Sequence, residues 1–66
     1  MSEWTLRALL VRRFGAVETT FEFRGERLPE VGDEIDLWAT KAEAAVRAKV
    51  TGVEPDKSLP VRAAEI

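Results

Sequence analysis

The side chains in this sequence that could do chemistry are mostly carboxylates, arginines and lysines. Histidine and cysteine are absent, so the commonest general base and the strongest nucleophile are both missing. Ser2 lies near the N-terminus and Ser58 lies in a turn, and neither has a base beside it in the sequence. The sequence also lacks a GxSxG motif, a phosphate-binding loop and a dinucleotide-binding fingerprint. We therefore expect a protein that is not an enzyme and uses no cofactor.

Several carboxylates lie close together in the middle of the sequence, namely Glu30, Asp33, Glu34 and Asp36. Calcium takes about six to eight oxygen ligands, and in an EF-hand one loop supplies most of them. The spacing here does not match such a loop, and part of the group falls on a predicted strand. Thiolate and imidazole metal sites are excluded because cysteine and histidine are absent. We interpret these carboxylates as a solvated acidic face and expect no metal site.

Length and composition predict one small globular domain over residues 1–66. Hydrophobic residues make up 45% and charged residues 33% of the chain, a balance that argues against disorder. A chain of this size buries only about 60% of the surface that its unfolded form exposes. No apolar run approaches the roughly 18 residues of a membrane span, and no signal-peptide core is recognised. We expect a cytoplasmic protein that does not contact a membrane.

The segment 28–37 organises the chain, because there a turn leads directly into a strand. Pro29 restricts its own φ and favours extended geometry in the residue before it. Gly32 tolerates positive φ, and Asp33 can accept a hydrogen bond from the local backbone. Ile35 and Leu37 then alternate with charged residues, with the period of two that is typical of a half-buried strand. This pattern predicts a strand over residues 34–39.

Alternating residues predict four further strands, over residues 4–13, 17–24, 46–53 and 59–66. The second is the clearest, with Val17, Thr19, Phe21 and Phe23 expected on one face. The first is apolar on both faces, so it is either covered on both sides or changes face at a bulge. In the last, Pro60 cannot donate a ladder hydrogen bond and belongs at the strand's start or on a sheet edge.

Residues 40–50 fit two structures. Thr40 and Glu43 have the spacing of a capping box, and the residues that follow have high helix propensity. Val46, Ala48 and Val50, however, alternate with polar residues. We predict a short helical turn over 40–45 followed by the strand 46–53. The alternative is a single helix over 41–49.

Together these elements predict a mainly β fold, a small five-stranded antiparallel barrel or rolled sheet. A closed barrel removes the exposed strand edges that invite aggregation. The leading hairpin, the Gly32-Asp33 turn into a middle strand and the closing hairpin resemble SH3-like small barrels. The likeness covers most of the chain but carries no specific motif, and such a likeness transfers no function.

Protein interaction is the leading functional hypothesis. Trp38 is predicted to share the outer face of its strand with Glu34 and Asp36, so either the 40–45 segment covers it or it is a binding anchor. Trp4 either closes one end of the barrel or contacts a partner. Leu9 and Val11 on the outer face of the first strand need something to pack against, and a second copy or another protein would supply it.

Binding of single-stranded nucleic acid is the alternative hypothesis. Small barrels bind single strands with a basic groove and stacking aromatic residues. Arg47 and Lys49 are predicted on one side of their strand, and Arg62 is expected beside them across the final hairpin. The net charge of −2 and the six carboxylates against two cations in residues 25–43 weaken any field that attracts phosphate. We therefore favour a protein partner or a homodimer, with no membrane partner and no small-molecule substrate.

Overall fold

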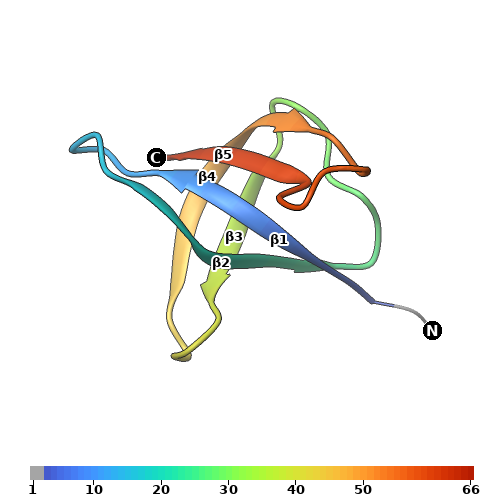
Figure 1. Ribbon diagram of the computed structural model, residues 1–66, viewed down its shortest axis with the longest axis horizontal. Coiled ribbons are helices and arrows are strands. Elements are labelled where there is room, and N and C mark those ends of the chain that lie inside the picture. The colour runs from blue at the N-terminus through green and yellow to red at the C-terminus, as the bar shows by residue number, and fades with distance from the viewer. Residues whose placement is uncertain (1–2) are drawn as a thin grey trace.

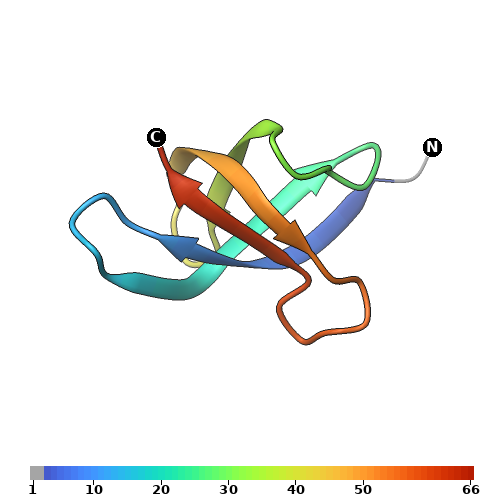
Figure 2. The ribbon, with the colours of Figure 1, turned by 90° about the horizontal axis from the view of Figure 1, so that it is seen from above.

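A computed structural model of the chain describes residues 3–66, which form a closed five-stranded barrel (Figure 1). Ser2 lies outside the described residues. The strands are β1 (Trp4–Val11), β2 (Val17–Gly25), β3 (Glu34–Ala39), β4 (Ala45–Val53) and β5 (Val61–Glu65). Each strand pairs antiparallel with the next, and β5 pairs in parallel with β1 to close the barrel (Figure 2). The predicted five-stranded barrel is confirmed, with one parallel strand pair that the sequence did not indicate.

The strands end where the sequence supplies turns. β1 stops at Val11 rather than at Arg13, because a tight turn follows in which Arg12 N donates to Ala16 O at 2.7 Å. Gly15 has a φ of 95° in this turn, a conformation that favours glycine. β5 begins directly after the buried Pro60, whose carbonyl accepts a hydrogen bond from Glu54 N at 2.7 Å. The strand predicted over residues 59–66 is therefore shorter in the structure, and Pro60 lies immediately before its first residue.

The predicted helical turn over 40–45 is wrong, and so is the alternative helix over 41–49. Residues 40–44 form a hairpin loop, closed by a hydrogen bond from Ala39 N to Ala44 O at 2.9 Å. Thr40 does not cap a helix, because its N–H and its Oγ1 both donate to the carbonyl of Thr20, at 3.0 and 3.2 Å. The alternation of residues 46–50 prevails over local helix propensity because it buries Ala48 and Val50 in the barrel.

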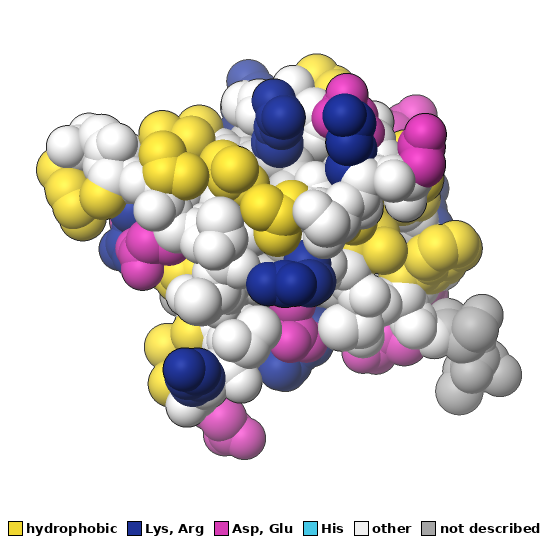
Figure 3. Space-filling view, viewed as in Figure 1, with side chains coloured by type: hydrophobic (Ala, Val, Ile, Leu, Met, Phe, Trp, Pro, Cys, Tyr) yellow, Lys and Arg dark blue, Asp and Glu magenta, His cyan; other side chains and the backbone are white. Residues whose placement is uncertain are grey.

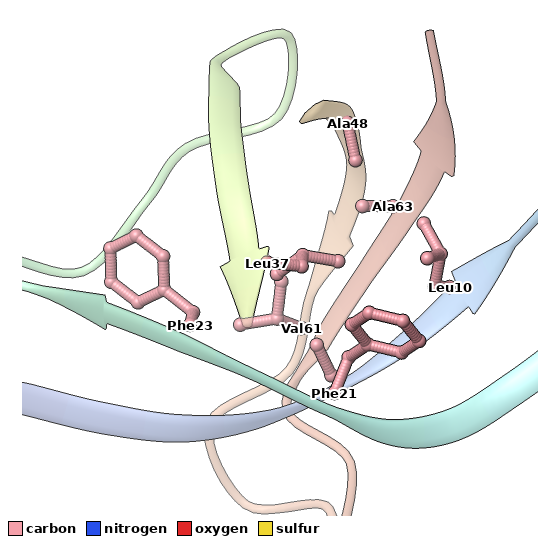
Figure 4. Packing of buried hydrophobic residues seen from close by; sticks show 8 residues of the cluster. Leu10, Phe21, Phe23, Leu37, Ala48, Val61 and Ala63 are labelled. Carbon is pink, nitrogen blue, oxygen red and sulfur yellow. The ribbon is translucent and has the colours of Figure 1, made fainter. Parts of the chain in front are cut away.

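The core fills the inside of the barrel with side chains from all five strands (Figure 4). Small residues point inward beside large ones, which lets the strands of a narrow barrel approach one another. The buried cluster consists of Ala8, Leu10, Phe21, Phe23, Leu37, Ala48, Val61 and Ala63. The labelled Phe23 lies apart from the other core residues, on the side of the connection between β2 and β3 (Figure 4).

A bulge in β2 changes which residues face outward. Ala8 pairs with Phe21 and Leu10 pairs with Glu18, so two residues of β2 lie opposite the single residue Leu9. The alternation of β2 therefore shifts at this point. The prediction that Val17 shares the face of Phe21 is wrong, because Val17 is 57% exposed whereas Phe21 is buried.

Replacing Gly25 by alanine is expected to destabilise the fold. A Cβ atom at Gly25 would overlap Cζ of Phe23, a ring that is only 7% exposed. Moving that ring within a packed core costs about 1–3 kcal/mol in the free energy of unfolding, measurable by urea denaturation. Gly52→Ala is the matched control, because its Cβ would lie 3.9 Å from the nearest atoms of Arg62. Equal losses in the two variants would contradict this packing.

Candidate interaction surface

Exposed hydrophobic side chains gather at one end of the barrel, over the β1–β2 hairpin and the end of β5 (Figure 3). Val11 is 38% exposed and pairs with Val17 of β2 on one side and with Ala64 of β5 on the other. Ile66 follows β5 directly and is 52% exposed. We call Leu9, Val11, Phe14, Val17 and Ile66 the apolar surface.

Three residues of the apolar surface, Phe14, Val17 and Ile66, are exposed in the structure but were not predicted as protein-contact residues from the sequence. Phe14, in the hairpin turn, is 77% exposed, and its position beside Gly15 in a short connector was the signal for this. Val17 faces outward only because of the β2 bulge, which no sequence signal announced. Ile66 was not identified as a binding residue from the sequence. Leu9 is half-buried and lies on the outer face of β1 with Val11.

An ion network holds the hairpin against the end of β5. The guanidinium of Arg12 donates to Glu18 Oε2 at 2.6 Å and to Glu65 Oε1 at 2.9 Å. The backbone N–H of Arg13 donates to the same Glu65 oxygen at 3.0 Å. One carboxylate at the end of β5 therefore binds two successive residues of the hairpin. The Arg12 guanidinium also lies 5.7 Å from the ring centroid of Phe14, within the range of a cation–π contact.

This network shifts the ionisation of its members. Hydrogen bonds from Arg12 and then from the Arg13 backbone lower the pKa of Glu65, and they outweigh the opposing effect of burial. The same bonds to Glu65 and Glu18 raise the pKa of Arg12. Both charged forms are thus favoured in the folded protein.

The two tryptophans proposed as contact residues lie away from the apolar surface. Trp4 begins β1, at the opposite end of the strand from Val11, and is 47% exposed. Trp38 is half-buried, and the Arg24 guanidinium lies 5.2 Å from its ring centroid. Arg24 is itself bound to Glu22 at 2.9 Å. Of the four residues predicted for protein contact, the structure brings only Leu9 and Val11 together.

The basic residues of the nucleic-acid hypothesis are interleaved with carboxylates. Arg47 contacts Asp36 at 3.2 Å, and Arg62 lies 4.0 Å from Glu54. Lys49 is the cross-strand partner of Glu34 on one side and of Ala64 on the other. The structure thus places these three residues on the paired strands β4 and β5, each cation with a carboxylate on a neighbouring strand or loop.

Comparisons with protein-family models, with curated proteins and with solved structures give no match. Within residues 3–66, no helix is long and apolar enough to cross a membrane. In the same range, no group of three or more acidic side chains is arranged to hold a metal ion.

We expect Glu65 to make stability depend on pH. Because folding lowers its pKa from the ordinary value of 4.5, its stabilising effect is present above that value and is lost as the pH falls through the folded-state pKa. The melting temperature of Glu65→Gln should lie below that of the wild type at neutral pH, and the difference should close in acid. Thermal melts followed by circular dichroism measure this difference. Glu43→Gln, in the exposed 40–44 loop, is the charge-matched control, and an equal difference for both variants at every pH would contradict the role of Glu65.

Proposed function

We propose that this chain is a non-enzymatic protein-interaction module, or a small subunit of a larger assembly, that binds its partner through the apolar surface. The observation that carries the proposal is the exposure of Val11, Phe14, Val17 and Ile66 at one end of the barrel. Single exposed hydrophobic residues are normal on a protein surface, but a contiguous group of them marks an interaction site. The fully buried centres of protein interfaces are more apolar than the rest of the protein surface.

The strand pairing and the ion pairs that hold these residues in place also favour binding. Val11 and Val17 lie on paired strands, and the Arg12 network fixes the intervening hairpin against β5. A surface that is already ordered loses less conformational entropy when a partner binds. Phe14, at the tip of this ordered hairpin, has the position of an aromatic anchor that inserts into a partner.

A protein partner fits the charge distribution better than nucleic acid does. Arg47 and Arg62 each lie within ion-pair distance of a carboxylate, which reduces the phosphate attraction that supplies nonspecific nucleic-acid affinity. The only aromatic side chain on the apolar surface, Phe14, lies on the hairpin rather than among Arg47, Lys49 and Arg62. An architecture that resembles SH3-like barrels transfers no function, so the proposal depends on the surface alone.

Site-specific photo-crosslinking tests this proposal. A photoreactive phenylalanine analogue at position 14 is expected to form adducts with protein, either with a second copy of the chain or with another protein in an extract of the source cells. The adducts should survive nuclease treatment. Val17→Glu should abolish them, because burying an unpaired charge in an apolar contact is costly.

The same analogue at position 43, in the exposed 40–44 loop, is the control and should give none of these adducts. The proposal is wrong if positions 14 and 43 give the same adducts, or if the adducts disappear after nuclease treatment. It is also wrong if position 14 forms no adduct with either a second copy or a protein of the extract.

A further inference from the structure

An open groove of about 630 Å³ lies under the connection between β2 and β3. This connection joins the end of β2 to the start of β3 and lies on the opposite side of the molecule from the β1–β2 hairpin (Figure 1). The groove is therefore separate from the apolar surface. Its lining consists of Phe23, Glu26, Arg27, Pro29, Asp33, Glu34 and Ile35.

The floor of the groove is apolar. Phe23 and Pro29 are buried and Ile35 is half-buried. Gly25 leaves room for the ring of Phe23, as a side chain there would overlap it. The position of the Phe23 ring in the floor of the groove therefore requires glycine at position 25.

The wall of the groove is held in place by backbone hydrogen bonds. Gly32 N donates to Val50 O, and Val50 N donates to Asp33 O, both at 2.8 Å. The Asp33 carboxylate also accepts a hydrogen bond from Glu30 N at 3.0 Å. The two bonds to Val50 tie the β2–β3 connection to β4, and the third stabilises the turn within the connection.

The rim of the groove carries an excess of negative charge. Glu26, Asp33 and Glu34 line it with one cation, Arg27. Within residues 3–66, neither Glu26 nor Glu34 lies within ion-pair distance of a cation in this structure, although Lys49 is the cross-strand partner of Glu34. An acidic rim around an apolar floor complements a side chain with an aliphatic stem and a cationic end.

We propose that this groove binds a peptide segment of a partner protein in which lysine or arginine lies next to apolar residues. The apolar side chains and the aliphatic stems pack on Phe23 and Ile35, and the cationic ends reach Glu26 and Glu34. Arg27 repels such a peptide and weakens its binding. This site is additional to the apolar surface, and its failure would leave the function proposed above unaffected.

The test is an amide NMR titration of the full chain with a capped hexapeptide of alternating leucine and lysine. We expect saturable chemical-shift changes at Phe23, Glu34 and Ile35 that weaken as salt is added. A second peptide with glutamate in place of lysine, and a third with serine in place of leucine, should bind much more weakly. Spermidine, a free polyamine with no apolar side chain, should also bind much more weakly.

Single substitutions at the rim should change the peptide affinity in a direction set by the charge that is removed. Glu34→Gln and Glu26→Gln should each weaken the peptide affinity about two- to fivefold, the effect of one exposed ion pair. Arg27→Gln should strengthen it by a similar factor, and Glu43→Gln, outside the groove, should leave it unchanged. Unperturbed core amides in each variant show that the fold is intact.

Three outcomes would overturn the proposal. The first is an absence of saturable shifts at the groove residues with the leucine–lysine peptide. The second is equal binding by spermidine or by the serine-containing peptide, which would mean that the apolar floor plays no part. The third is a weaker affinity in Arg27→Gln, which would mean that Arg27 attracts the peptide rather than repelling it.

Discussion

The parallel pairing of β1 with β5 is the constraint on which the rest of the structure depends. Without it, five strands in simple succession would form an open sheet with two free edges, which invite aggregation. With it, Ala8 and Leu10 meet Val61 and Ala63 inside the barrel. A chain of 66 residues without cysteine has no disulfide to hold its ends together, so strand pairing and the Arg12–Glu65 contact do so.

The same pairing explains why β1 is apolar on both faces. Its inner residues build the core, whereas its outer residues Leu9 and Val11 lie beside β5 and form part of the apolar surface. The ion network around Arg12 holds the β1–β2 hairpin beside the end of β5, because Glu65 binds both Arg12 and the Arg13 backbone. The apolar residues of both segments therefore belong to the same surface. β1 therefore contributes both to the stability of the barrel and to the binding surface that we propose. The acidic groove under the β2–β3 connection is separate from that surface.

The sequence predicted the strands well and the candidate site only in part. The bounds of β3 follow directly from the Gly32-Asp33 turn and the alternation of Ile35 and Leu37, because these signals are local. The outward position of Val17 depends on a bulge, and the exposed end of β5 depends on closure of the barrel. Such features are set by pairing between distant strands and have no local signal. The 40–44 loop was misjudged for the same reason, because strand pairing outweighed its helix propensity.

In the function that we propose, ion pairing and strand pairing hold the β1–β2 hairpin rigidly, so that its exposed apolar residues form one ordered surface. Backbone ¹⁵N relaxation of the free chain measures this rigidity at the amides of residues 12–16 and at Ile66. We expect order parameters near 0.85, as in the strands, and lower values for the hairpin in Arg12→Gln. Order parameters below about 0.6 in the wild-type hairpin would contradict it, because the apolar residues would then form no fixed surface.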